Sequence, residues 1–201
     1  MQNLIRLVGF LTAIGACGGA QAEDFNWQAR GALTHVVPTS SPGKIINHSA
    51  EVDIDNAFSV TGTVSYFINP HVALDLLVGW PPQHDIQVDG VKVGETKHLP
   101  PILSLQYYFT PEATISPYVG LGLNYTYLFD SKLDSGDKLH LSSSIGMAAQ
   151  AGVDYRLNSR WSVGADVRYA DIDTDVKING TQLGNININP LIYSLNVGYR
   201  F

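Results

Sequence analysis

The chain has 201 residues, of which 45% are apolar and 15% are charged, and its formal net charge is −6. This composition argues against a disordered chain, and the acidic balance provides no basic surface for nucleic acid. A single cysteine, Cys17, excludes a disulfide framework and a thiolate zinc site.

The first 22 residues are typical of a secretory signal peptide. Arg6 is their only charged residue, an apolar stretch covers residues 7–16, and Ala20-Gln21-Ala22 supplies the small residues of a cleavage site. We therefore expect residues 1–22 to be removed and residues 23–201 to form one domain. The alternative is lipoprotein cleavage before Cys17, which would leave that cysteine lipidated.

Eight stretches of the remaining chain alternate apolar and polar residues, which is the pattern of half-buried β-strands. They cover residues 25–37, 52–68, 72–80, 96–109, 117–129, 141–157, 161–169 and 186–201. In the fifth stretch, for example, Leu121, Leu123 and Tyr125 alternate with Gly122 and Asn124. An even number of such strands can close into a barrel without an unpaired edge.

The side chains on the two faces distinguish a soluble barrel from a membrane barrel. The polar faces are rich in Gly, Ser, Thr and Asn, which fit a narrow eight-stranded interior, whereas large aromatic residues lie mainly on the apolar faces. The aromatic residues are also expected to form two belts, as at two membrane–water interfaces. One belt comprises Tyr66, Phe67, Tyr107, Phe109, Tyr118, Tyr155, Trp161, Tyr199 and Phe201, and the other comprises Trp80, Tyr125, Tyr127, Phe129 and Tyr169.

Connection lengths differ between the two ends of the predicted barrel. The short connections are residues 69–71, 110–116 and 158–160, and the long ones are residues 39–51, 81–95, 130–140 and 173–185. Asp89-Gly90 and Asn179-Gly180 predict hairpin turns within two of the long connections. We therefore predict an all-β fold: an eight-stranded antiparallel transmembrane β-barrel with short periplasmic turns and longer extracellular loops, in the outer membrane of a Gram-negative cell.

Several stretches, taken in order, resemble the outer-membrane protein W (OmpW) family. They are Lys97-His98-Leu99-Pro100-Pro101, Leu103 to Phe109, Pro117 to Tyr125, Gln150 to Tyr155, Asp171 to Thr174 and Gly198 to Phe201. The resemblance covers essentially all of residues 23–201 and is weakest in the loops. The alternating aromatic ending at Tyr199 and Phe201 also resembles the signal that the bacterial barrel-assembly machinery reads.

The resemblance implies an outer-membrane channel or carrier for passive uptake of small hydrophobic molecules, with lateral release through the wall into the membrane. Its expected partners are outer-membrane lipid, lipopolysaccharide, the barrel-assembly machinery and small hydrophobic solutes. Leu99, Pro100 and Pro101 are candidates for the lateral opening, because proline donates no ladder hydrogen bond. The alternative interpretation of these residues is a bulge or the start of a strand at the outer edge.

The polar faces of the predicted strands supply the candidate lumen residues. These are Asn124, Thr126, Gln150, Asp154, Asp166, Arg168 and Asn196. Because Arg156 and Arg200 are also predicted to point inward, the lumen would contain charge of both signs. Unpaired charges would be costly in so narrow a space, so an ion-pair plug is one expectation.

No catalytic or metal-binding pattern is apparent, so we expect no enzyme, cofactor or metal site. The six histidines lack metal-ligand spacing, and there is no G-x-S-x-G motif. Asp171 to Asp175 resembles the start of a calcium loop, but Val176 and Gln182 stand where glycine and glutamate are required. Two alternatives to transport remain: a structural or surface-interaction barrel that meets phage or toxins, and a barrel enzyme using His35, His98 or His140.

Overall fold

Eight long strands form the body of the structure, a computed structural model that describes residues 26–38, 43–45, 50–80, 83–88, 91–99, 101–133, 139–178 and 181–201. We call them the barrel strands. They are β1 (Trp27–Val37), β4 (Ala57–Asn69), β5 (Val72–Gly79), β8 (Ile102–Tyr108), β9 (Ile115–Leu133), β11 (Ser144–Arg156), β12 (Trp161–Ala170) and β15 (Leu191–Arg200). Each contains at least half of one predicted strand.

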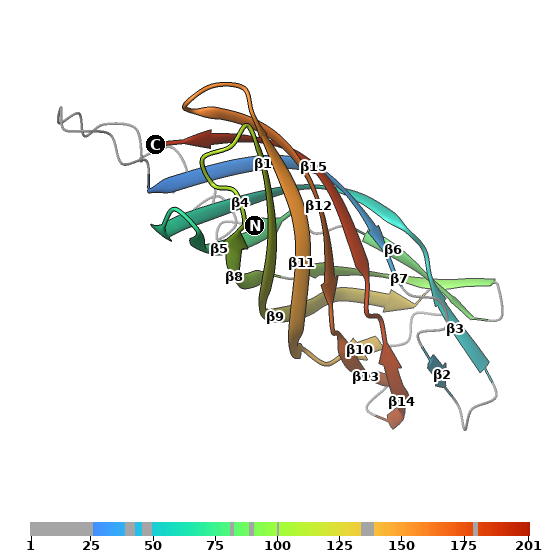
Figure 1. The fold of residues 1–201 in the computed structure, drawn as a ribbon. Coiled ribbons are helices and arrows are strands. Elements are labelled where there is room, and N and C mark those ends of the chain that lie inside the picture. Colours follow the sequence, from blue (N-terminus) through green and yellow to red (C-terminus); the bar gives the residue numbers. More distant parts are fainter. Residues whose placement is uncertain are drawn as a thin grey trace, which may run out of the picture.

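The barrel strands close into a cylinder in which all neighbours are antiparallel (Figure 1). Their hydrogen-bonded order is β11-β12-β15-β1-β4-β5-β8-β9, and β9 pairs with β11 to complete the ring. The first and last barrel strands pair from Gln28↔Arg200 to Val37↔Leu191. The predicted eight-stranded antiparallel barrel is therefore confirmed.

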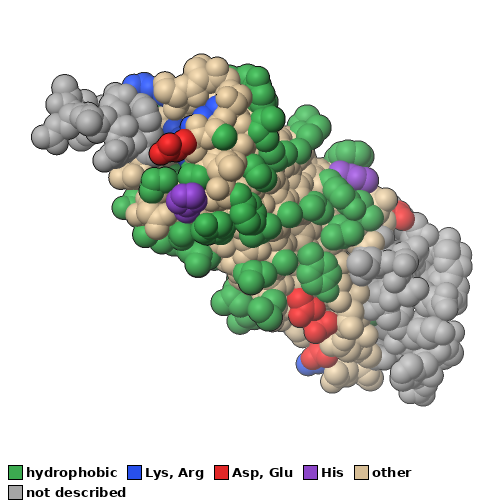
Figure 2. All heavy atoms as spheres, in the orientation of Figure 1, with side chains coloured by type: hydrophobic (Ala, Val, Ile, Leu, Met, Phe, Trp, Pro, Cys, Tyr) green, Lys and Arg blue, Asp and Glu red, His purple; other side chains and the backbone are tan. Residues whose placement is uncertain are grey.

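Burial alternates along each barrel strand, with the large apolar side chains outside. In β15, Ser194 and Asn196 are buried, whereas Leu195 is 70% and Val197 is 50% exposed. Figure 2 shows hydrophobic side chains covering the outer surface of the barrel. A soluble barrel would turn this face inward, whereas a lipid-spanning barrel turns it outward. The predicted orientation of the faces is thus the one that the structure has.

Two aromatic residues of the first predicted belt, the one at the short connections, point into the barrel, so their assignment to the belt was wrong. Phe67 and Tyr118 are buried and lie against Tyr108, with ring centroids 5.3 and 4.9 Å from the Tyr108 ring. Both occupy the alternate positions of their strands whose side chains point into the barrel. Space for Tyr118 comes from Gly152, where an added Cβ would lie 2.5 Å from the tyrosine ring.

One end of the barrel has short turns, and we call it the short-turn end. Asn69 Oδ1 accepts hydrogen bonds from the backbone N–H groups of His71 and Val72, both at 2.9 Å. Asn158 Oδ1 does the same for Arg160 and Trp161. An asparagine side chain that binds the backbone two or three residues on stabilises a tight turn.

The opposite end, which we call the long-hairpin end, carries seven further strands. They are β2 (Gly43–Ile45), β3 (Ala50–Ile54), β6 (Gln83–Val88), β7 (Val91–Leu99), β10 (Leu139–Leu141), β13 (Asp173–Ile178) and β14 (Thr181–Asn187). The predicted long connections contain paired strands, so backbone pairing continues beyond the barrel. The β6–β7 and β13–β14 hairpins agree with the predicted ones, although Asp89-Gly90 and Asn179-Gly180 lie outside the described residues.

Four predicted continuous strands are each divided where the barrel meets these extensions. Residues 52–68 divide into β3 and β4, 96–109 into β7 and β8, 141–157 into β10 and β11, and 186–201 into β14 and β15. Proline explains two of the breaks, since Pro101 and Pro190 cannot donate a ladder hydrogen bond. Asp55-Asn56 and Ser142-Ser143 lie at the other two.

Asn189 turns the chain between β14 and β15, and its backbone φ is 38°. Its Oδ1 accepts a hydrogen bond of 2.8 Å from the Ile172 N–H. We expect Asn189→Ala to lower the free energy of unfolding by about 1–2 kcal/mol more than Asn189→Gly. Both substitutions remove the hydrogen bond, but only alanine has a Cβ that is strained in the left-handed region. Urea unfolding of the refolded barrel measures the difference, and equal effects would contradict the prediction.

Candidate functional site

Two arginines and three aspartates form an ion-pair network inside the barrel, nearer its short-turn end. They are Arg30 of β1, Asp75 of β5, Asp154 of β11, and Asp166 and Arg168 of β12. Each is at most 9% exposed, and Asp75 is fully buried. Four different strands around the ring thus contribute charged side chains to one layer of the interior.

Arg30 binds two of the three carboxylates. Its Nη2 lies 2.8 Å from Asp154 Oδ2, and its Nη1 lies 3.5 Å from Asp75 Oδ1. Ser65 connects the same groups, because its hydroxyl accepts from Arg30 Nη1 at 2.9 Å and donates to Asp75 Oδ1 at 2.6 Å. Arg30 also donates to the Tyr108 hydroxyl.

Asp75 joins the two arginines into one network. Its Oδ2 accepts from Arg168 Nη1 at 3.0 Å, while Arg168 Nε donates to Asp166 Oδ1 at 2.9 Å. Asn196 donates to the other oxygen of Asp166 at 3.2 Å. A buried charge is tolerated when it is paired and hydrogen-bonded, as each of these five charges is.

The network extends across the interior from β1 to β5 and from β1 to β11. Tyr108 and Tyr118 pack beside it, and the Arg30 guanidinium carbon lies 5.7 Å from the centre of the Tyr118 ring. Gly164 makes room on the neighbouring strand β12, since a Cβ there would lie 2.6 Å from Asp154 Oδ1. The charged and aromatic side chains together occupy the part of the lumen that a solute moving along the axis would cross.

A layer of buried apolar side chains lies between this network and the long-hairpin end. It consists of Val36, Leu77, Ile102, Ala148, Ala170, Ile172, Val176, Ile186, Ile188 and Ile192, and we call it the apolar layer. Six of its members come from the long-hairpin ends of barrel strands, and the other four come from β13, β14 and the adjoining residues. The interior therefore changes from charged to apolar along the barrel axis.

Among the described residues, the pairing between β5 and β8 stops beside the apolar layer. The β5–β8 ladder ends at Leu77↔Ile102, and the β6–β7 ladder begins only at Gln83↔Lys97. Between these positions, no register pair joins the two strands within the described residues. We call this interruption the β5–β8 seam. The pair that ends the ladder, Leu77 and Ile102, also belongs to the apolar layer.

On their other side, β7 and β8 remain paired with β9 along the length of the seam. Leu99↔Tyr127 and Ile102↔Asn124 follow one register with β9. The Pro101 carbonyl accepts a hydrogen bond of 3.0 Å from the Tyr125 N–H. Separation at the seam would therefore leave the contact with β9 in place.

Two of the three residues proposed for the lateral opening, Leu99 and Pro101, lie beside this seam. Leu99 is the last residue of β7, Pro101 precedes β8 and is partly exposed, and Pro100 lies outside the described residues. The chain end proposed as an assembly signal pairs with β1: Phe201 accepts from the Trp27 N–H at 3.1 Å and donates to the Trp27 carbonyl at 2.9 Å. Tyr199 is in register with Ala29 and Trp161.

All seven proposed lumen residues are buried in the structure: Asn124, Thr126, Gln150, Asp154, Asp166, Arg168 and Asn196. Three belong to the ion-pair network, and Asn196 donates to it. Asn124 lies outside the ion-pair network. Its Nδ2 donates a hydrogen bond of 2.7 Å to the Asp171 carbonyl, which lies beyond Ala148 of the apolar layer. Thr126 donates to Asn124 at 3.1 Å.

Arg30 and Asp75 are functional candidates that sequence reasoning missed. A signal was present, because Arg30 shares the polar face of its strand with Gln28, and Asp75 separates Leu74 from Leu76. The apolar layer was also missed. Its members have the same inward phase as the polar residues, and an apolar residue in that phase was not counted as lumen.

The described residues show no group of three histidine, cysteine, aspartate or glutamate side chains that could hold a metal ion. Within the same part of the chain, no helix is long and apolar enough to cross a membrane. The described interior thus consists of a layer of packed apolar side chains above a layer of paired charges.

Comparison with known proteins gives consistent matches. Residues 23–201 match the OmpW family. The chain is 31% identical to outer membrane protein W of Vibrio cholerae, with 100% of both chains covered. It is 29% identical to the dibenzothiophene metabolism operon protein PahQ of Pseudomonas aeruginosa, with 90% of each chain covered.

Solved structures include a similar barrel. The crystal structure of outer membrane protein OprG from Pseudomonas aeruginosa superposes with a TM-score of 0.80 at 30% sequence identity. The match covers 87% of this chain and 95% of that one.

Proposed function

The chain belongs to the OmpW family of Gram-negative outer-membrane β-barrels, and on that basis we propose that it passes small hydrophobic molecules from outside the cell into the outer membrane. In such barrels the short turns face the periplasm and the long hairpins face outward. The apolar layer then lies on the side from which a solute arrives. This layer is the observation that carries the proposal, because an apolar solute gains free energy by leaving water for it.

The ion-pair network argues for sideways release. An apolar molecule that continued along the axis would have to displace buried, paired charges, which is costly. The β5–β8 seam offers an alternative, because it adjoins the apolar layer at Leu77 and Ile102. Its outer side faces acyl chains, so a solute that leaves there passes from one apolar environment to another.

The name of one relative supports this solute class. PahQ is named as a protein of a dibenzothiophene metabolism operon, and dibenzothiophene is an aromatic, water-insoluble molecule. We propose the same broad class, small and largely apolar, for this chain. Two further proposals are that Tyr199 and Phe201 engage the barrel-assembly machinery, and that the long hairpins contact lipopolysaccharide.

A disulfide across the seam tests lateral release. Val78→Cys with Pro101→Cys would connect outward-facing positions of the two strands just beyond the last ladder pair. In Gram-negative cells expressing this variant, we expect oxidation to reduce uptake of the apolar fluorophore N-phenyl-1-naphthylamine to the level of cells without the barrel. Reduction with dithiothreitol should restore uptake, because the two strands can then separate.

The matched control places a disulfide lower in the same two strands. Leu74 and Leu105 are register partners within the β5–β8 ladder, so Leu74→Cys with Leu105→Cys fixes strands that are already paired. We expect unchanged uptake in this control. If mass spectrometry shows a complete Val78–Pro101 crosslink and uptake persists, lateral release through the seam is wrong. If no variant or native barrel increases uptake, the transport proposal itself fails.

A further inference from the structure

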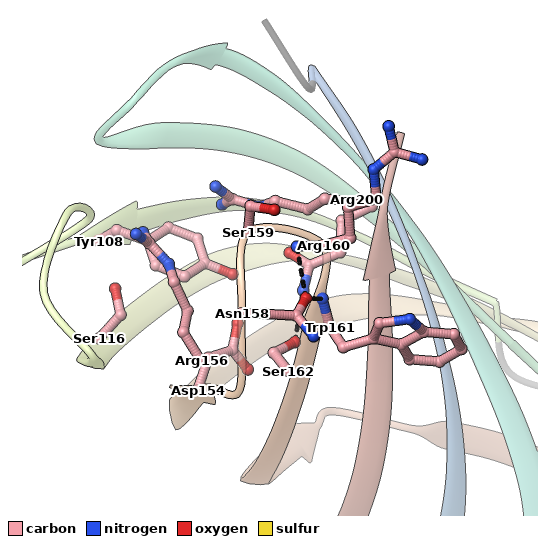
Figure 3. A pocket seen from close by; sticks show the side chains of 11 residues that line it. Tyr108, Ser116, Asp154, Arg156, Asn158, Ser159, Arg160, Trp161, Ser162 and Arg200 are labelled. Carbon is pink, nitrogen blue, oxygen red and sulfur yellow. Dashed lines mark hydrogen bonds between the residues drawn. The ribbon is translucent and has the colours of Figure 1, made fainter. Parts of the chain in front are cut away.

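A pocket opens at the short-turn end, on the far side of the ion-pair network from the apolar layer (Figure 3). Gln28, Ser116, Asp154, Arg156 and Arg200 line it, together with residues of the 158–160 turn. The lining side chains come from β1, β8, β9, β11, β12 and β15 and from the turn between β11 and β12. The pocket therefore lies at the expected periplasmic mouth and is separate from the proposed solute path.

The charge of this pocket is positive. Arg156 and Arg200 both line it, and among the described residues neither guanidinium forms a salt bridge. Arg200 stacks on Phe67, with its guanidinium carbon 3.9 Å from the ring centre. This stacking leaves the N–H edges of the guanidinium available for hydrogen bonds. The carboxylate in the lining, Asp154, is already paired with Arg30 at 2.8 Å.

Buried polar atoms without partners also line the pocket. Ser116 and Gln28 are 3% and 2% exposed, and Ser116 Oγ and Gln28 Oε1 have no hydrogen-bond partner. The serine hydroxyl can donate to a ligand. Gln28 Nε2 donates to Ser162 Oγ at 3.2 Å, and rotating the amide would let Ser162 donate instead and turn the NH₂ group into the pocket. Leaving such groups unpaired is unfavourable, so a ligand with acceptor oxygens would be stabilised.

The number of these donors indicates which anion fits. Ser116 is on β9, Arg156 on β11 and Arg200 on β15, so hydrogen bonds are offered from three strands. A carboxylate has only two oxygens, whereas a phosphate presents three or four. Guanidinium groups bind phosphate strongly through parallel hydrogen bonds. We propose that this pocket binds a phosphate group, either free in the periplasm or on the headgroup of a phospholipid in the inner leaflet.

Asp154 adds selectivity among anions. Its Oδ1 has no hydrogen-bond partner and lies in the pocket lining, so it can accept a proton-bearing group of the ligand. Hydrogen phosphate carries such a proton, and the ammonium group of phosphoethanolamine supplies one beside a phosphodiester. Sulfate at neutral pH carries none, so its oxygen would meet the carboxylate with like charge. The pocket should therefore prefer phosphate to sulfate.

The test uses the full barrel, refolded in a phosphate-free glycoside detergent, with ³¹P NMR titration of inorganic phosphate. We expect saturable binding of phosphate, and an inhibition constant for sulfate at least ten times the dissociation constant of phosphate. Arg156→Gln combined with Arg200→Gln should weaken binding at least tenfold, and Ser116→Ala should weaken it severalfold. The control Lys177→Gln removes a charge at the long-hairpin end and should change affinity less than twofold.

Gel migration with and without heating shows whether each variant has folded, and Ser116→Ala provides the test if the double arginine variant does not fold. Unsaturable binding, equal affinity in native and variant barrels, or equal binding of phosphate and sulfate would each overturn the proposal. Nanodiscs distinguish the two sources of phosphate. If phosphatidylethanolamine in the disc competes with inorganic phosphate, the headgroup is the occupant; if it does not, free phosphate is.

Discussion

Replacing Arg30 with methionine should lower the free energy of unfolding of the barrel by about 3–5 kcal/mol, the usual cost of leaving a buried charge without its partner. Methionine fills a similar volume but removes the contacts to Ser65, Tyr108, Asp75 and Asp154. Asp154 loses its ion-pair partner, and Asp75 keeps only Arg168. Urea titration of the refolded barrel, followed by tryptophan fluorescence, measures the change.

Two comparison variants separate charge from packing. Lys177→Met makes the same kind of replacement at the long-hairpin end, and a substitution at such a surface position should stay within about 0.5 kcal/mol. Adding Asp154→Leu to Arg30→Met removes the carboxylate that was left unpaired, so the double variant should be more stable than Arg30→Met alone. A double variant that is less stable than the single one would show that the charges do not control the effect.

Replacing Ile102 with asparagine should reduce uptake of an apolar solute by about tenfold while the barrel remains folded. Ile102 is 1% exposed, belongs to the apolar layer and ends the β5–β8 ladder at the seam. An amide there retains water and removes apolar contact area, and about 1.4 kcal/mol of lost solute affinity corresponds to a factor of ten. The initial rate of fluorophore uptake in cells, normalised to the amount of folded barrel, is the measurement.

Ile102→Leu is the matched control, because it keeps an apolar side chain of the same volume and should leave uptake within about twofold. If uptake is equally low in both variants, altered packing of the barrel wall, and not the polarity of the side chain, explains the effect. Uptake that is normal in both would mean that solutes do not cross the apolar layer.

The barrel was predictable because alternation is a local property. Leu121, Leu123 and Tyr125 had to lie on one face whatever their neighbours were, and the structure places them outside. The divided strands were less predictable. Pro101 and Pro190 mark two of the breaks, and Asp89-Gly90 predicts a hairpin, but the pairing of β6 with β3 joins segments that are not adjacent in the sequence.

The site was predictable only in part, because its contacts depend on how strands are staggered around the closed ring. The phase of Asp154 and Arg168 indicated that they face inward, but it could not show that Arg30 meets Asp75 and Asp154, which lie far apart in the sequence. Phe67 and Tyr118 were assigned to the wrong side because their position at a rim was given more weight than their phase.

The pairing of β1 with β15 has a consequence for how the protein is made. Trp27 and Phe201 exchange backbone hydrogen bonds, so the ring cannot close until the last residue has been synthesised and exported. Until then the chain is an open sheet or a disordered polymer whose apolar side chains face water, a state that aggregates readily. Contacts between distant chain segments also form slowly. The molecule must therefore be kept soluble in transit, and holding factors in the periplasm would serve that need.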